Sequence, residues 1–128
     1  MATVRDYMAS ELTVLAPNEG VMNAMRRMLD ARISGAPVVD THGNLVGILT
    51  QRDCLTVAYR ASYHGEPAGV VANYMTREVE TVPVDMDLVE VIGRFFERPH
   101  RRFAVVDGNQ LVGLITRRDV LRAVLELA

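Results

Sequence analysis

The chain has 128 residues, the size of one domain, and its 49% hydrophobic and 23% charged residues are ordinary for a globular protein. This composition excludes an intrinsically disordered chain, which needs low hydrophobicity and high net charge. The formal net charge is −2, which argues against a strongly basic nucleic-acid binder. All 14 basic residues are arginine, which excludes chemistry that needs a lysine side chain. The single cysteine, Cys54, cannot form an internal disulfide, and no apolar run is long enough to cross a membrane, so we expect a cytoplasmic protein.

An internal repeat organises the sequence. Asp6-Tyr7-Met8 recurs as Asn73-Tyr74-Met75, and residues 45–53 recur as residues 111–119 after a one-residue deletion in the preceding Gly/Asn turn. Each copy alone is too small to bury much apolar surface, so we expect the two copies to pack on each other. The predicted organisation is a first repeat over residues 1–62, a linker over residues 63–70 and a second repeat over residues 71–128.

The first repeat opens with a short β-prone run at residues 13–15. A helix is predicted over residues 18–32, because apolar residues recur there at helical spacing. Two apolar runs joined by a short turn, residues 36–40 and 45–49, predict a β-hairpin. A second helix begins after the Thr50-x-x-Asp53 motif. The residues expected on its apolar side are Leu55, Ala58 and Tyr59.

The second repeat follows the same order. A β-prone run at residues 81–84 leads to a helix for which Asp85 is the expected N-cap and Pro99 the stop. A β-hairpin is predicted over residues 103–107 and 111–115, and a final helix begins after Thr116. The residues expected on the apolar side of that helix are Val120, Leu121, Val124 and Leu125. Each repeat therefore reads β-α-β-β-α, which predicts an α+β fold.

The stretch from Ser34 to Asp53 carries a resemblance to a known family. Its Pro-Val-Val-Asp and Gly-Ile-Leu-Thr-x-x-Asp strings resemble a CBS domain, named for cystathionine β-synthase, and residues 105–119 match the same pattern. Two copies in tandem resemble a Bateman module. In such a module two CBS domains pack with pseudo-two-fold symmetry into one compact unit.

The resemblance implies a non-catalytic regulatory module that needs no cofactor. Such modules bind an adenosine-containing ligand in clefts between the repeats, here AMP, ADP or ATP in first place, with S-adenosylmethionine and NAD(H) as further members of the class. The family also implies a homodimer built by the first helices of the repeats. Met22, Met25 and Met28 lie on the first helix of the first repeat. The ligand would then report the energy state to a separate effector protein.

The Gly-h-h-Thr-x-x-Asp motif, where h is apolar, stands at both strand-to-helix junctions. Thr50 and Thr116 occupy N-cap positions and Asp53 and Asp119 follow three residues later, so helix capping alone explains the spacing. The same geometry suits a ligand, because a helix start favours phosphate and a carboxylate accepts from ribose hydroxyls. The resemblance assigns phosphate to the two threonines and ribose to the two aspartates, and capping is compatible with both roles. The glycine of each motif leaves room for backbone or a ligand.

Residues before each hairpin complete the predicted sites. The resemblance places adenine against main-chain groups just before the second strand and closes each site from the first strand. Core packing is an equally good explanation for Ile33, Ala36 and Phe103. The residues assigned in this way are Thr13, Val14, Ile33, Ser34, Gly35, Ala36 and Pro37 in the first repeat, and Thr81, Arg101, Arg102, Phe103 and Ala104 in the second.

Basic residues distinguish the two repeats. The second repeat has an arginine-rich stretch at residues 98–102, where the first has only Arg32 nearby. The resemblance assigns phosphate contacts to Arg101 and Arg102, whose forked guanidinium groups suit phosphate oxygens. Arg52 and Arg118 are weaker phosphate candidates. The alternative is a solvated charge run at a helix end.

Two other functions stay open. The apolar, methionine-rich helix of the first repeat favours a ligand-independent module that dimerises or docks on a partner. The arginines of the second repeat would suit a nucleic-acid binder, although the acidic net charge argues against it. An enzyme has the least support, because no acid–base pair, activated nucleophile or metal cluster occurs at usable spacing.

Overall fold

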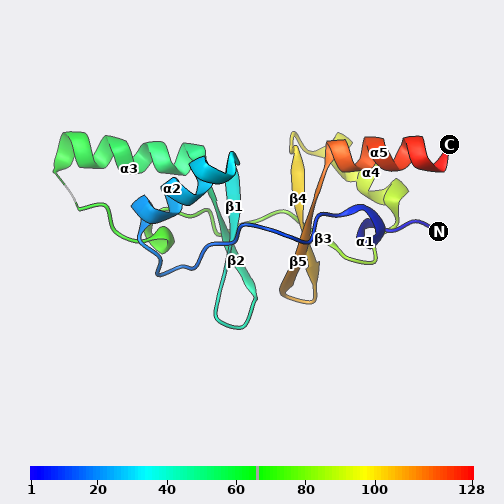
Figure 1. Cartoon of the computed structure of the whole chain (residues 1–128), viewed down its shortest axis with the longest axis horizontal. Helices are drawn as coiled ribbons and strands as arrows, with labels where there is room; N and C mark the ends of the chain where they lie inside the picture. Colours follow the sequence, from blue (N-terminus) through cyan, green and yellow to red (C-terminus); the bar gives the residue numbers. More distant parts are fainter. Residues whose placement is uncertain (66) are drawn as a thin grey trace. The chain divides into compact units, whose positions relative to one another are not determined.

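The computed structural model describes residues 1–65 and 67–128 and confirms an α+β fold with two sheets (Figure 1). Glu66, which falls in the predicted linker, lies outside the described residues. Contacts divide the chain into two compact units. We call Thr13–Val79 the first-copy unit, and Met1–Leu12 together with Glu80–Ala128 the second-copy unit.

The sheet of the first-copy unit is an antiparallel hairpin of two strands, extended on each edge by a single residue. Leu15 forms a parallel bridge with Val38, and Thr76 forms an antiparallel bridge with Ile48 on the other strand. The predicted run at residues 13–15 thus contributes one bridge rather than a strand. The elements of this unit are α2 (Val21–Ala31), β1 (Gly35–Val39), β2 (Leu45–Thr50), α3 (Gln51–His64) and the short 3-10 helix η1 (Val71–Asn73).

The second-copy unit has a sheet of three strands in the order β3-β4-β5. The β3 strand runs parallel to β4, and β4 pairs antiparallel with β5. Ala9 adds an antiparallel bridge to Leu114 at the free edge of β5. The elements of this unit are α1 (Val4–Tyr7), β3 (Thr81–Pro83), α4 (Leu88–Glu97), β4 (Arg102–Asp107), β5 (Gln110–Thr116) and α5 (Arg117–Leu127).

The segment that opens each sequence copy packs on the sheet of the other copy. A Cβ placed on Gly47 would lie 2.7 Å from the Sδ atom of Met75, and one on Gly113 would lie 2.6 Å from the Sδ atom of Met8. The methionine of the repeated Tyr-Met pair therefore covers the glycine of the repeated Gly-h-h-Thr motif. The compact units for this reason do not follow the sequence copies.

The first predicted helix is shorter than its periodicity indicates. It was expected over residues 18–32, but α2 begins at Val21 and ends at Ala31. The start is displaced because Gly20 forms an antiparallel bridge with Val70, a residue far along the chain. Backbone committed to that bridge cannot also adopt the first helical turn.

The predicted N-cap of α4 is wrong by two residues. The cap is Asp87, whose carboxylate accepts from the Val89 N–H at 2.8 Å. Asp85 instead pairs with Arg5 at 3.3 Å on the surface. Residues 86–88 hydrogen-bond with the N-terminal segment, which fixes the point at which the helix begins.

Several residues predicted on the apolar sides of the second helices are exposed. Leu55 is 69% and Leu125 79% exposed, whereas α3 buries Val57, and α5 buries Ala123 together with Val120, which was predicted on its apolar side. Each unit has its own core. The fully buried residues include Leu15, Val21, Ala24, Ala36, Val38, Leu49 and Val71 in the first-copy unit, and Val4, Val82, Val91, Phe103, Val105 and Ile115 in the second-copy unit. In the part of the chain that the structure describes, every helix is too short or too polar to cross a membrane.

Candidate functional site

The junction between β2 and α3 forms a reciprocal cap. The Thr50 N–H donates to Asp53 Oδ2 at 2.9 Å, and the Asp53 N–H donates to Thr50 Oγ1 at 3.1 Å. The junction between β5 and α5 has the same geometry, with Thr116 and Asp119 at 2.9 and 3.1 Å. The predicted capping boxes are therefore confirmed, and they hold the four candidate side chains in matching positions.

The caps leave hydrogen-bonding capacity unused. A hydroxyl that accepts one hydrogen bond still has its own proton to donate, and a carboxylate with one occupied oxygen can accept further bonds. The second oxygen of Asp53 lies 3.5 Å from Thr76 Oγ1. The second oxygen of Asp119 lies 3.6 Å from the guanidinium of Arg122. Both aspartates are partly exposed, so they remain within reach of a ligand.

The helix starts offer fewer amides to a phosphate than the sequence indicates. The Gln51 N–H donates to the Ser34 carbonyl at 2.8 Å, and the Arg117 N–H donates to the Arg101 carbonyl at 3.2 Å. The amide three positions after each cap threonine is taken by the cap itself. A phosphate at these junctions would therefore depend more on hydroxyl and guanidinium groups than on the helix start.

The residues before each hairpin lie beside the caps. Gly35 pairs with Thr50 in the first-copy sheet, and Arg102 pairs with Thr116 in the second-copy sheet. Thr81 pairs with Ala104 from the neighbouring strand. Within each unit, the structure thus brings the loop, the strand ends and the cap to one place.

Three of the predicted adenine-contacting residues are core residues. Ala36 is fully buried and Phe103 is 1% exposed, and both belong to the core clusters. Pro37 is also buried, in the middle of β1. Their side chains are therefore closed to a ligand, and the Pro37 carbonyl already accepts from the Leu15 N–H at 2.9 Å.

The first β-prone runs of the two repeats align differently in the structure from the way their similar sequences suggest. Leu15 bridges Val38, and Val82 pairs with Val105, so Val14 is the counterpart of Thr81. Thr13 lies one position further out.

The Val14 carbonyl also accepts from the Arg27 guanidinium at 2.9 Å, and Glu19 holds that arginine at 2.8 Å. No local sequence signal marks this anchor, because its groups come from three separate segments.

The arginines of the second-copy unit surround its cap. Arg101 and Arg118 are exposed and Arg102 is half-buried. The Arg117 Nε donates to the His100 carbonyl at 3.0 Å, which ties the start of α5 to the loop before β4. Arg98 pairs with Glu80 at 3.7 Å and is in part neutralised. Only Arg52, exposed at the start of α3, occupies a comparable place in the first-copy unit.

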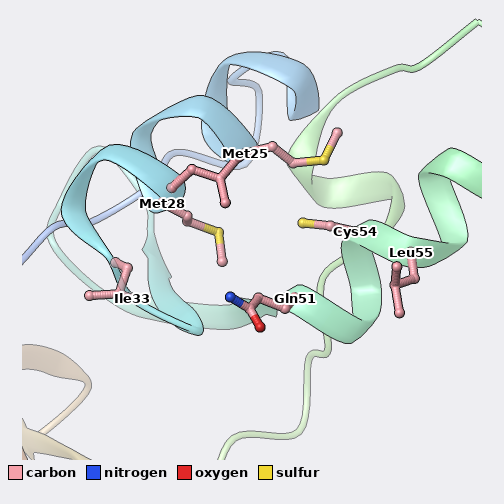
Figure 2. A pocket seen from close by; sticks show the side chains of 7 residues that line it. Met25, Met28, Ile33, Gln51, Cys54 and Leu55 are labelled. Carbon is pink, nitrogen blue, oxygen red and sulfur yellow. The ribbon is translucent and has the colours of Figure 1, made fainter.

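An apolar groove that the sequence did not reveal lies between α2 and α3. Met25 and Met28 face Gln51 and Cys54 across it (Figure 2). The groove has a volume of about 260 Å³. Burial and the nearby charge of Asp53 raise the pKa of the Cys54 thiol. The full lining is Met25, Met28, Leu29, Ile33, Gln51, Cys54 and Leu55.

The second-copy unit has a groove of about 420 Å³ between α4 and α5 at the matching positions. Its lining is Ile92, Phe95, Phe96, Arg117, Val120 and Leu121. Both grooves are open on the helical side of their unit. The residues that border them are among the most exposed apolar residues of the chain, with Phe96 at 87% and Leu29 at 70%.

Comparison with known proteins places these features in a family. The CBS domain model matches residues 4–60 and again residues 71–126. The CBS domain-containing protein YhcV of Bacillus subtilis is 29% identical over 121 residues, which are 94% of this chain and 84% of that protein. Two archaeal relatives are longer, and the chain spans 22% and 41% of their lengths.

Solved structures agree with this match. The CBS-pair protein CBSX2 of Arabidopsis thaliana, solved in complex with AMP, superposes with a TM-score of 0.86 at 29% identity, and the match covers 99% of this chain and 98% of that one. The CBS domain pair of protein MJ0100, in complex with 5'-methylthioadenosine and S-adenosyl-L-methionine, gives a TM-score of 0.76 at 26% identity over 100% and 99% of the two chains. The chain therefore belongs to the CBS domain family and carries two copies of that domain in tandem.

Proposed function

We propose that the protein is a non-catalytic regulatory module that binds an adenosine-containing ligand, with AMP, ADP and ATP as the first candidates. The observation that carries this proposal is the doubled Thr-x-x-Asp cap, in which each threonine keeps a hydroxyl proton and each aspartate keeps a carboxylate oxygen. These two groups lie beside the first residue of the hairpin, since Gly35 pairs with Thr50 and Arg102 with Thr116. The AMP complex of CBSX2 and the nucleoside complexes of MJ0100 support the ligand class.

Each residue type at the cap has a distinct role in this proposal. The aspartates Asp53 and Asp119 accept hydrogen bonds from ribose hydroxyls, because a carboxylate suits a pair of such donors. Thr50 and Thr116 donate to a phosphate oxygen. Backbone groups of the loop before β1 or β4 read the adenine edge. The further residues assigned to the sites are Thr13, Val14, Ile33, Ser34, Gly35, Ala36, Pro37 and Arg52, and Thr81, Arg101, Arg102, Phe103, Ala104 and Arg118.

Signalling requires that the ligand bind two states of the protein with different affinity. We propose that the signal reaches a separate effector protein, and that the protein acts as a homodimer. The exposed apolar residues along the helices support the dimer, since Leu29, Phe96 and Leu121 are each at least 65% exposed. Exposed apolar residues beside an apolar groove, Leu29 in the first-copy unit and Phe96 with Leu121 in the second-copy unit, are typical of an interaction site.

A second candidate function has its own observation. The two apolar grooves and their exposed borders would serve a ligand-independent module that only dimerises or docks on a partner. In this case the Thr-x-x-Asp caps only stabilise the starts of α3 and α5 and bind no ligand. The two functions differ in whether an adenosine ligand changes the protein.

A thermal-shift screen separates the two candidates. Purified protein is heated with AMP, ADP, ATP, S-adenosylmethionine or NADH, and with guanosine monophosphate as a matched control for the base. A ligand present at 100 times its dissociation constant stabilises the folded state by about 2.7 kcal/mol, a shift of several degrees for a chain of this size. A rise with an adenosine ligand alone supports the proposal. Mass spectrometry first verifies that the purified protein carries no ligand. If none of the five adenosine compounds then changes the melting temperature, the interaction module is favoured.

A further inference from the structure

One backbone bridge attaches the segment before α2 to the sheet of the first-copy unit. The Leu15 N–H donates to the Pro37 carbonyl, and the Leu15 carbonyl accepts from the Val39 N–H, both at 2.9 Å. Within the part of the chain that the structure describes, Thr13 and Val14 form no backbone hydrogen bond to β1. A segment attached at a single residue can pivot there unless another group holds its end.

Val14 lies on the side of the bridge that faces the cap. The bridge between Leu15 and Val38 is parallel, so the residues before Leu15 run alongside the residues before Val38, toward the start of β1. Gly35 stands at that start and pairs with the cap residue Thr50. The position of Val14 therefore sets where the segment passes the first-copy cap.

A side chain of α2 supplies the second attachment. Nη2 of Arg27 donates to the Val14 carbonyl at 2.9 Å, and Nη1 of the same guanidinium lies 2.8 and 2.9 Å from the two carboxylate oxygens of Glu19. Asn23 also donates to that carboxylate at 2.9 Å, and the Glu19 side chain is only 12% exposed. Glu19 therefore fixes the direction of the planar guanidinium, whose other nitrogen then fixes Val14.

The second-copy unit holds the matching segment in a different way. There β3 pairs with β4 over three residues, and Thr81 is the first of them. Arg94 occupies the place of Arg27, at the same spacing from the first strand, but Met86 stands where Glu19 would. Among the described residues, no carboxylate forms an ion pair with Arg94. Strand pairing in this unit thus replaces the ion pair of the other unit.

We infer that Arg27 is a positioning residue for the first-copy site: it fixes Val14, and with it the edge that closes the site, while Glu19 orients its guanidinium. This inference rests on the proposed function, in which Thr13 and Val14 belong to that site. An edge that is already held in place spares the ligand the cost of ordering it, so loss of the attachment lowers the affinity. The second-copy site needs no such pair, because β3 supplies its edge.

The variant Arg27→Lys separates positioning from folding. An ammonium group keeps a positive charge for Glu19, but it lacks the planar fork that reaches Glu19 and Val14 at the same time. Arg94→Lys is the matched control in the second-copy unit. Calorimetric titration of AMP is done in an Asp119→Asn background, in which the second-copy site is weakened and the first-copy site dominates the signal. Melting curves verify that each variant is folded at the titration temperature.

Hydrogen exchange of the Leu15 N–H, followed by NMR, is the second measurement. This amide leaves its bridge when the segment pivots, so its exchange should be faster by about threefold or more in Arg27→Lys and unchanged in Arg94→Lys. AMP at saturation should slow the exchange again, because the bound ligand orders the edge. A purely structural role would lower the melting temperature but leave the AMP affinity of the folded protein unchanged.

In the Asp119→Asn background, Arg27→Lys should weaken AMP about three- to tenfold, and Arg94→Lys should leave the affinity unchanged. Equal AMP affinity with and without Arg27→Lys, or unchanged exchange at Leu15, would overturn the inference while the proposed function stands. AMP binding by the wild type but not by Asp119→Asn would also overturn it, because the first-copy cap would then bind no AMP. If the wild type binds none of AMP, ADP and ATP, the proposed function itself is contradicted.

Discussion

Met75 lies directly over Gly47, so that a Cβ at residue 47 would stand 2.7 Å from its sulfur and 3.0 Å from the Thr76 carbonyl oxygen. Met8 has the same relationship to Gly113. The glycine in each Gly-h-h-Thr-x-x-Asp motif is thus explained by close approach of the chain itself. A ligand is not needed to account for it.

Replacing either glycine should destabilise its unit. In Gly47→Ala and Gly113→Ala the new methyl group meets backbone oxygen as well as a flexible methionine, and backbone cannot move aside cheaply. We expect a loss of about 1–3 kcal/mol in the free energy of unfolding, measured in urea. Gly93→Ala is the control, because nothing lies within 4 Å of its Cβ position. Within α4 this change should raise the free energy of unfolding by about 0.5–1 kcal/mol. Equal stability of the three variants would show that Met8 and Met75 do not require glycine at residues 113 and 47.

The roles of Asp119 in capping and in binding can be separated. Asparagine keeps one acceptor for the Thr116 N–H but loses the charge and the second carboxylate oxygen, whereas alanine loses both. Asp119→Asn should therefore melt close to the wild type, and Asp119→Ala should lose about 1 kcal/mol of stability. Both should weaken AMP binding about tenfold or more.

Asp30→Asn, an exposed change on α2, is the matched control and should alter neither property. If Asp119→Asn bound AMP as tightly as the wild type, the ribose role would be lost and only the cap would remain.

The Cys54 thiol should react slowly. Burial and the charge of Asp53 raise its pKa, so a smaller fraction is thiolate at pH 8 than in the unfolded chain. Because the raised pKa belongs to the folded state, the associated stability is complete below the unfolded pKa and declines as the pH rises through the folded pKa. Iodoacetamide labelling at pH 8 should be slower for folded protein than in urea, and Asp53→Asn should increase the rate. Equal rates for folded and unfolded chains would refute the shift.

The exposed apolar residues predict a dimer that a single charge disrupts. Phe96 is 87% exposed, so Phe96→Asp should change the stability of the unit by no more than about 0.5 kcal/mol. Analytical ultracentrifugation should show a dimer for the wild type and a monomer for this variant. Ser10→Asp places the same charge on an exposed loop residue and should remain dimeric. A wild-type monomer, or a dimer that survives Phe96→Asp, would rule out this surface.

The order of elements was readable from the sequence because each signal is local. Thr50 with Asp53 and Thr116 with Asp119 are capping pairs within one helical turn, and the hairpins are adjacent apolar runs around a Gly/Asn turn. Repetition made the assignment firmer, since the same order appears in both copies. The positions of the predicted site residues around each cap follow from these local elements.

The predictions that were wrong concern features that depend on contacts between residues far apart in the sequence. The start of α2 is set by the bridge from Gly20 to Val70, and the choice of Asp87 over Asp85 is set by the N-terminal segment. Helical periodicity marked Leu55 and Leu125 as apolar but could not tell a core face from an outer face. The sequence also could not show which copy each Tyr-Met segment packs on, because Met8 and Gly113 are far apart in the sequence and meet only in the folded chain.

Calorimetric titration of AMP into the wild-type protein and into the double variant Asp53→Asn/Asp119→Asn tests whether the capping aspartates form the adenosine site. Both proteins keep an acceptor at each cap, and a melting curve without ligand verifies that they fold alike. We expect saturable binding of AMP by the wild type and at least about a tenfold loss of affinity in the double variant. Equal affinity in the two proteins would contradict the claim that the capping aspartates form the adenosine site.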